Sequence, residues 1–216
     1  MRPARLQEEA RWSRIRVLAV LVLLAVSVGT WLLFGKGISD EEPASMEMRI
    51  MSVKETFPTA LAAAREWRPD AILEDADIWF RRQTDPRELR IGYGFRSPGE
   101  PRAWLNVWVI ERGDGLDVVL QEGEFELPEP KPIGQPVDPM SLPLDSPEVL
   151  RIMLDNGGRE FIAQHLYIHW PMSIILRYRD LYYSRGDLLW VGLFFEMLTG
   201  DDLDIAINAV TGELEK

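Results

Sequence analysis

The sequence of 216 residues contains no cysteine, which excludes disulfides, thiolate nucleophiles, cysteine-based zinc sites and iron–sulfur clusters together. Basic residues are outnumbered: 24 Lys and Arg stand against 35 Asp and Glu, for a formal net charge of −11. Because an acidic chain binds phosphate backbones poorly, we expect no nucleic-acid partner. The only two histidines are His165 and His169. On a strand this spacing separates them by about 13 Å, too far to share a metal ion.

Motifs of catalysis and phosphate binding are missing as well. The chain has no glycine-rich phosphate loop, no Gly-x-Ser-x-Gly elbow and no His-Glu-x-x-His stretch. Two acidic groups could serve general acid–base chemistry or bind Ca²⁺, but neither extends into a full calcium loop, and solvated turn acids are the simpler interpretation. We therefore expect no enzyme activity, no metal and no cofactor. The groups are Glu74, Asp75 and Asp77, and Asp201, Asp202 and Asp204.

What the sequence does contain is an uncharged apolar run at residues 17–35. As a helix it spans about 28 Å, close to the thickness of a bilayer core. Residues 1–16 hold five Arg against two Glu, so the positive-inside rule places them in the cytoplasm. We predict a single-pass plasma-membrane protein with its C-terminal part outside the cytoplasm. A cleaved signal peptide, with a small-x-small site at Ala25-Val26-Ser27, and a buried soluble helix are the alternatives.

The remaining residues divide into four segments. Residues 36–53 are predicted to be a stalk, 54–127 a first folded unit, 128–145 a proline-rich linker and 146–216 a second unit. Each unit begins with a helical pattern, from Phe57 to Trp67 with Thr56 as its cap and from Ser146 onward. Strand-like segments follow each helix. They cover 76–81, 89–95, 104–110 and 116–120 in the first unit, and 161–170, 174–182, 188–197 and 203–207 in the second.

The two units also align with each other. Residues 113–118 match residues 200–205 at a constant offset of 87, and Trp104 and Trp190 precede these two segments at an offset of 86. The alignment indicates a tandem repeat of one α+β unit. We therefore predict an α+β protein in which an N-terminal transmembrane helix precedes two helix-plus-antiparallel-sheet units.

The end of the chain carries a family resemblance. The stretch Ile205-Ala206-Ile207-Asn208-Ala209-Val210-Thr211-Gly212-Glu213-Leu214 resembles the closing signature of PepSY domains, and Leu189-Trp190-Val191 is similar to their central strand. The resemblance covers about residues 146–216, with a fainter echo at 58–126, where Gln121-Glu122-Gly123-Glu124 departs from the signature. It implies an exported or membrane-tethered binding or regulatory module, and it transfers no catalytic residue.

Strand aromatics supply the candidate binding surface. Adjacent strand residues face opposite sides of a sheet, so one member of each aromatic pair must leave a helix-covered face. We expect a non-catalytic module that binds a protein, a peptide or an envelope component, with protease regulation as one role. A hydrolase that uses an acidic cluster and a structural assembly subunit are the alternatives. The candidate surface residues are Trp79, Tyr93, Trp108, Tyr183 and Phe195.

Overall fold

The computed structural model describes residues 47–82, 87–125, 133–165, 172–180, 185–196 and 199–215. Contacts divide the chain into two compact units, Met1–Met46 and Glu47–Lys216. All described residues belong to the second unit. The predicted tail at 1–16, the apolar segment at 17–35 and most of the stalk at 36–53 lie outside the described residues.

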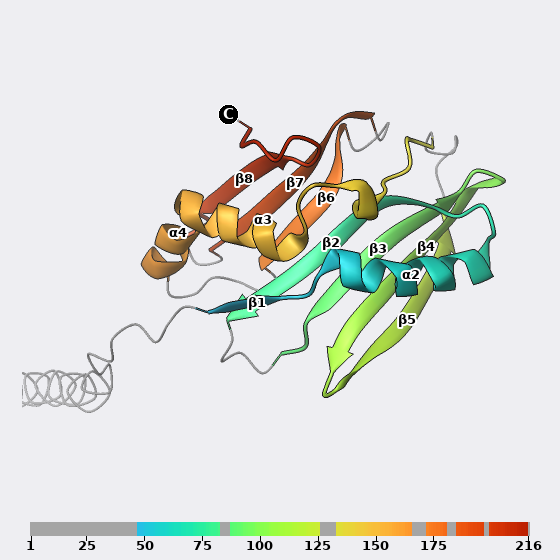
Figure 1. The fold of residues 1–216 in the computed structure, drawn as a ribbon, viewed down its shortest axis with the longest axis horizontal. Helices are drawn as coiled ribbons and strands as arrows, with labels where there is room; N and C mark the ends of the chain where they lie inside the picture. Colours follow the sequence, from blue (N-terminus) through green and yellow to red (C-terminus); the bar gives the residue numbers. More distant parts are fainter. Residues whose placement is uncertain are drawn as a thin grey trace, which may run out of the picture. The chain divides into compact units, whose positions relative to one another are not determined.

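The second unit is built on one antiparallel sheet of eight strands, shown in Figure 1. The order is β5-β4-β3-β2-β6-β7-β8, and β1 pairs with β2 beside this path. The strands are β1 (Met48–Ile50), β2 (Ile72–Arg82), β3 (Arg90–Ser97), β4 (Glu100–Arg112), β5 (Gly115–Glu124), β6 (Met172–Asp180), β7 (Arg185–Phe195) and β8 (Asp202–Asn208).

The two halves of the chain share this sheet through β2 and β6. Ala76 lies opposite Leu176, and Phe80 lies opposite Met172. The predicted fold of two tandem units, each with its own sheet, is therefore wrong. The physical reason is that β2 and β6 would otherwise be edge strands with unpaired backbone groups, and pairing them satisfies both. Strand patterns in a sequence indicate strands and not which strands pair.

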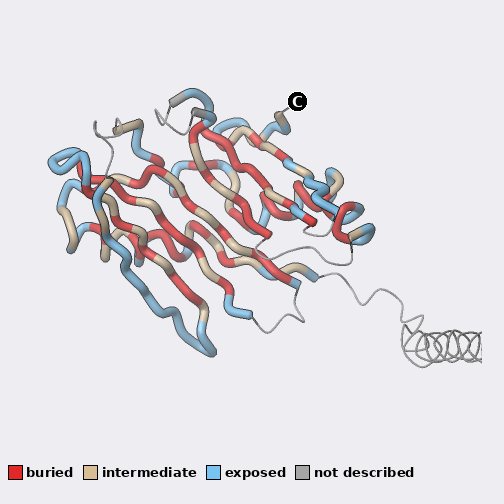
Figure 2. Tube along the Cα trace, turned by 180° about the vertical axis from the view of Figure 1, so that it is seen from behind, coloured by how far each residue is buried: buried red, intermediate tan, exposed pale blue. Residues whose placement is uncertain are grey.

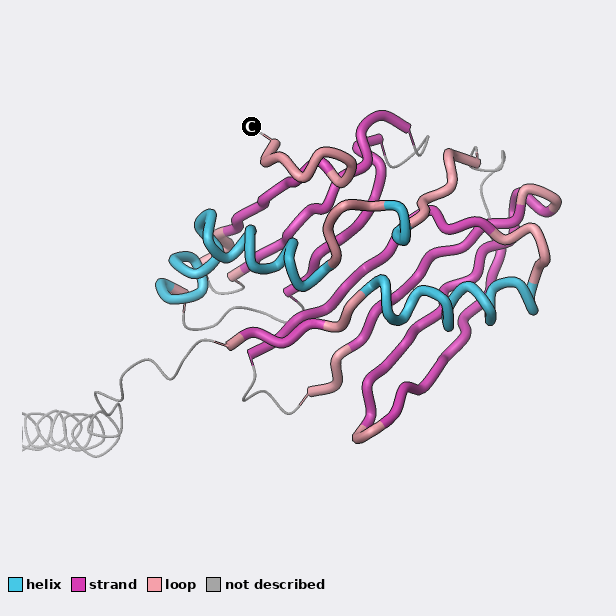
Figure 3. Tube along the Cα trace, in the orientation of Figure 1, coloured by secondary structure: helices cyan, strands magenta, loops and turns pink. Residues whose placement is uncertain are grey.

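In the described part of the chain, α-helices cover one face of the sheet, as Figure 3 shows. They are α2 (Val53–Trp67), α3 (Ser146–Met153) and α4 (Arg159–Gln164), with short helical turns η2 (Pro139–Ser141) and η3 (Leu154–Gly158). Sheet residues on the covered face form the core. Those with the lowest exposure include Ile78, Phe80, Tyr93, Phe95, Val107, Ile174, Trp190 and Ile207.

Two local predictions need correction. The first helix begins at Val53 and not at Phe57, because Ser52 and not Thr56 caps it, accepting a hydrogen bond from the Glu55 N–H. The start of the predicted strand at 161–170 is helical, since α4 extends to Gln164 and buries Phe161. The rest of that segment, from 166, lies outside the described residues.

The described part of the predicted linker packs against the folded unit. Val137 and Leu142 are buried, and the Val137 N–H donates to the Leu73 carbonyl at 2.9 Å. Asp145 then reaches the N-terminus of α2, where its carboxylate accepts from the Val53 N–H at 3.0 Å. Residues 133–145 therefore connect β2 with the N-terminus of α2. Residues 128–132 of the predicted linker lie outside the described residues.

Within the ranges given above, no helix is both long enough and apolar enough to cross a membrane. The described residues thus hold no counterpart of the predicted transmembrane helix, and they give no support to the predicted single-pass location in the plasma membrane. Residues 17–35, on which both predictions rested, lie outside those ranges.

Candidate functional site

The two edges of the sheet differ. The outer side of β8 is capped by the C-terminal segment: the Asn208 N–H donates to the Glu213 carbonyl at 2.8 Å, and the Glu215 N–H donates to the Ala206 carbonyl at 2.9 Å. Among the described residues, no strand pairs with the outer side of β5. The C-terminal segment therefore covers one edge of the sheet at residues 206–208, whereas the other edge is open over the length of β5.

One hydrogen bond determines which residues of β5 direct their backbone groups toward the open edge. The Phe125 N–H donates to the Arg102 carbonyl at 2.9 Å, and this pair continues the β4–β5 register without a shift. Hydrogen-bonded and non-hydrogen-bonded pairs alternate along an antiparallel ladder. Odd-numbered residues of β5 therefore bond to β4, and the even-numbered residues direct their N–H and C=O groups outward. The outward groups belong to Leu116, Val118, Leu120, Glu122 and Glu124.

The side chains of β5 are mainly apolar on the helix side, and one apolar residue also lies on the open face. Val119 lies on the open face of the sheet, opposite Trp108, while Leu116, Val118 and Leu120 lie on the helix side. Helix α2 packs on β4 and β3 and leaves β5 beyond its flank. Figure 2 accordingly shows β5 as a long exposed band. The exposed fractions are 48 % for Leu116, 40 % for Val118, 45 % for Val119 and 53 % for Leu120.

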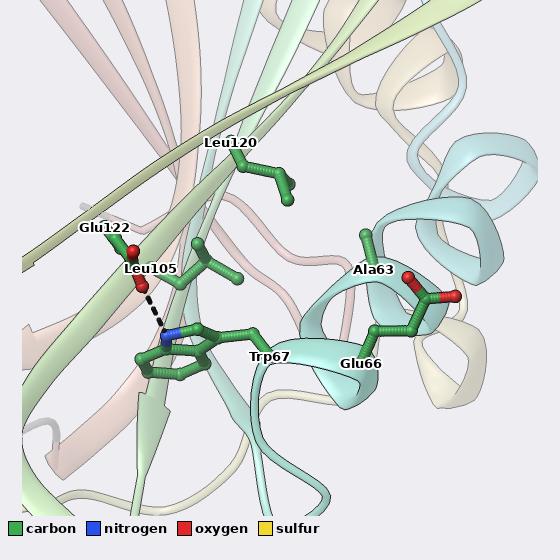
Figure 4. Close-up of a pocket in the computed structure, with 6 residues that line it drawn as sticks. All are labelled: Ala63, Glu66, Trp67, Leu105, Leu120 and Glu122. Carbon is green, nitrogen blue, oxygen red and sulfur yellow. Dashed lines mark hydrogen bonds between the residues drawn. The ribbon is translucent and has the colours of Figure 1, made fainter.

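A pocket of about 360 Å³ lies between α2 and β5, drawn in Figure 4. The indole N–H of Trp67 donates to the Glu122 carboxylate at 3.0 Å. Figure 4 shows Glu66 on the helix side of the pocket and Glu122 on the strand side. The lining thus combines apolar surface, one aromatic ring and two carboxylates. The lining residues are Ala63, Glu66, Trp67, Leu105, Leu120 and Glu122.

The open face carries a second cluster, centred on Arg90. Its guanidinium carbon lies 3.0 Å from the ring centroid of Trp79 and 4.9 Å from that of Trp108. The two rings meet edge to face at 6.0 Å. The Trp79 indole N–H donates to Asp77 at 2.8 Å. Burial raises the pKa of Asp77 and lowers the pKa of Arg90, so both charges lie in a partly dehydrated site.

The predicted surface residues separate into three environments. Trp79 and Trp108 come together in the Arg90 cluster. Phe195 is exposed on β7 of the same face, beyond β6. Tyr93 lies in the core, where its hydroxyl bonds to Thr56 at 2.7 Å and it contributes nothing to a surface. Tyr183 lies outside the described residues.

The apolar edge was not among the sites predicted from the sequence. Residues 116–120 were predicted to be a strand, but they do not alternate, since Val118, Val119 and Leu120 are consecutive apolar residues. Such a run at the end of a hairpin indicates a strand that is apolar on both faces. In a strand at the edge of a sheet, such a run of apolar residues is the signal that could have identified the exposed apolar edge.

The acidic groups occupy different environments. Glu74 is buried with Arg96, 3.6 Å from its guanidinium, whereas Asp202 and Asp204 are exposed on β8. Asp201 lies 3.3 Å from His165. Over the described ranges, no group of three or more His, Asp or Glu residues is arranged to hold a metal ion.

The comparisons with known proteins identify no family. No protein-family model matches the chain, so the resemblance to PepSY domains gains no support from one. No curated protein matches it in sequence. One solved structure, a "putative lipoprotein" from Clostridium difficile 630, aligns with a TM-score of 0.47 and 10% identity, over 74% of this chain and 90% of that one. At this level the likeness supports no statement about what this chain does.

Proposed function

We propose that this protein is a non-catalytic binding module that takes up an extended peptide segment of another protein as an added strand on β5. The observation that carries the proposal is the open edge of the sheet, where outward backbone groups and exposed apolar side chains coincide. Strand addition uses backbone hydrogen bonds for affinity and side-chain pockets for selectivity. The open edge supplies the backbone groups for these hydrogen bonds, and the pocket beside Trp67 is the side-chain pocket.

The character of β5 supports this role. Unpartnered edge strands are usually shortened, bulged or protected by lysine or proline, because they pair with other chains. β5 has ten residues, pairs with β4 without a register shift and contains neither lysine nor proline, and the charges that it carries are all acidic. A strand of this kind has the form of a docking edge.

Hydrogen exchange on the full chain tests the proposal. The probe is a ten-residue peptide of alternating valine and threonine, and its control is the same peptide with every backbone nitrogen methylated. We expect the unmodified peptide to slow amide exchange at Leu116, Val118, Leu120 and Glu122, whose N–H groups point outward. The N-methylated peptide should have little effect, because it cannot complete the ladder.

A variant pair sharpens the test. Leu120→Lys places a charge on the proposed edge and should weaken peptide binding. Val210→Lys changes another exposed apolar residue, 65% exposed and outside the sheet, and should leave binding unchanged. Unchanged exchange at β5 with excess peptide would overturn the proposal. Protection that rises with protein concentration alone would identify a second copy as the occupant and would also overturn it.

A further inference from the structure

We infer that the pocket between α2 and β5 selects a lysine or arginine side chain in the added strand. This inference rests on the proposed function, because it needs a peptide on β5. A residue paired directly with Leu120 or Glu122 projects its side chain to the same face of the sheet as they do. That face is the helix side, so the incoming side chain lies at the mouth of the pocket.

The pocket matches a long cationic side chain in its apolar part. Leu105, Leu120 and Ala63 provide aliphatic surface for the methylene stem. The Trp67 indole provides an aromatic wall, and cations are attracted to such rings. A volume of about 360 Å³ accommodates one such side chain.

The pocket also matches the charge. Two carboxylate residues belong to its lining, Glu66 from the helix and Glu122 from the strand (Figure 4). Glu122 already accepts from Trp67, but a carboxylate has further acceptor sites for an ammonium or guanidinium group. The guanidinium carbon of Arg68 lies 5.1 Å from the Trp67 ring centroid, and this guanidinium pairs with Glu100 at 2.8 Å.

The rest of the strand is acidic as well. Asp117 and Glu124 lie on β5, and the neighbouring cation Arg112 is shared between Glu88 at 2.9 Å and Asp117 at 3.3 Å. A second copy of this chain would bring the same carboxylates against this edge, which like-charge repulsion opposes. A cationic segment of a different protein avoids that repulsion, so charge complementarity favours it as the occupant.

A peptide series on the full chain tests the inference. Three ten-residue peptides share the alternating valine framework and carry lysine, glutamine or glutamate at the intervening positions. We expect the lysine peptide to bind about tenfold more tightly than the glutamine peptide and the glutamate peptide to bind most weakly. The preference should shrink at high salt, because exposed charges are screened.

Two charge-removing variants locate the preference. Glu66→Gln combined with Glu122→Gln should bring the lysine and glutamine peptides to within about twofold of each other. Glutamine still accepts from the Trp67 indole, so the fold is preserved, and an unchanged thermal midpoint verifies this. The control Glu213→Gln removes one exposed acid near the opposite edge and should keep the preference.

The outcomes separate the two proposals. If the three peptides bind equally and all protect β5, the charge selection is wrong while strand addition stands. If none protects β5, both are wrong. A preference for lysine that survives in the double variant would place the selecting acids elsewhere and overturn the role of the pocket.

Discussion

The carboxylate of Asp145 accepts a hydrogen bond from the backbone N–H of Val53, 92 residues earlier in the chain, at 3.0 Å. The same oxygen accepts from the N–H of Ser146 at 2.7 Å, and the other oxygen bonds to the Ser52 hydroxyl. One acidic side chain thus stands at the N-termini of both α2 and α3, where unsatisfied N–H groups and the helix dipoles favour negative charge.

Removing this carboxylate should therefore weaken two helices together. We expect Asp145→Ala to lower the free energy of unfolding by about 2–4 kcal/mol, since each lost cap costs about 1 kcal/mol and the Ser52 hydroxyl also loses its partner. Urea denaturation measures this. Asp138→Ala removes the cap of the short turn η2 and should cost less than about 1 kcal/mol. Equal losses in the two variants would contradict the double-cap interpretation.

The buried pair Glu74–Arg96 should behave as a coupled unit. Their side chains are 6 % and 2 % exposed, and burial lowers the pKa of Arg96. Removing one partner leaves a charge in a dry site, so Glu74→Leu or Arg96→Met should each cost about 3–5 kcal/mol. The double variant should cost clearly less than the sum of the two. A double-mutant cycle by chemical denaturation measures the coupling, and additive losses would refute it.

The Arg90 cluster depends on a glycine beneath Trp108. A Cβ at Gly92 would lie 2.6 Å from the Trp108 ring, so Gly92→Ala must displace that ring from beside Arg90 and Trp79. We expect a loss of about 1–3 kcal/mol and a changed near-ultraviolet circular dichroism signal. Gly115→Ala is the control, since its added Cβ would meet nothing closer than 3.9 Å. An unchanged aromatic signal in Gly92→Ala would contradict the arrangement.

His165 and Asp201 should make stability depend on pH. The pKa of His165 is raised, first by its hydrogen bond to the Phe161 carbonyl and then by Asp201. The stabilisation from a raised pKa is present in full below the unfolded-state value of about 6.5 and is lost as pH rises through the folded-state value. The thermal midpoint should therefore lose this contribution on going from pH 5 to pH 8.

Asp201 contributes with the opposite sign. Its pKa is lowered, first by the Thr199 hydroxyl and then by His165, so its stabilisation is lost only as pH falls through that lowered value in the acid range. In Asp201→Asn, an NMR titration of the His165 ring should show a lower pKa than in the parent chain. The variant Asp202→Asn should leave the His165 titration nearly unchanged. Identical His165 titrations in the parent chain and Asp201→Asn would show that the pair does not interact.

The hairpins of the sheet were within reach of the sequence. The turn between β4 and β5 consists of Gly113 and Asp114, residue types that favour turns, and Gly113 adopts φ +56°. The matched Gly200 adopts φ +75° before β8. These are local choices, set by a few neighbouring residues. The pairing of β2 with β6 is not local, and no periodicity within either strand encodes it.

The internal alignment also fails at a definable point. Trp104 precedes Gly113 by nine residues, and Trp190 precedes Gly200 by ten. Because side chains alternate along a strand, a difference of one residue reverses the face. Trp190 is accordingly buried on the helix side, whereas Trp104 lies half-buried over Gly123 on the open face. The two aligned tryptophans, Trp104 and Trp190, therefore do not occupy equivalent positions in the sheet.

The sequence also did not show on which face of the sheet each candidate surface residue lies. Aromatic residues in strands were identifiable, but their face depends on the register between strands. Tyr93 lies opposite Val107 on the helix side, and its neighbour Gly92 lies opposite Trp108 on the other. One position along the strand separates a core tyrosine from a surface cluster. The exposed edge, in turn, depends on which strand ends the sheet, and that is a property of the whole topology.

The β2–β6 junction has a consequence for the order of synthesis. Ala76 and Leu176 are partners, yet the ribosome makes one about a hundred residues before the other. Until β6 has emerged, the first half of the nascent chain carries an incomplete sheet. In this sheet β2, which is central in the finished protein, is an edge strand. Contacts between such distant segments slow folding, and an uncovered edge invites pairing with other chains. A newly made copy is therefore most vulnerable to misassembly while its second half is still being translated.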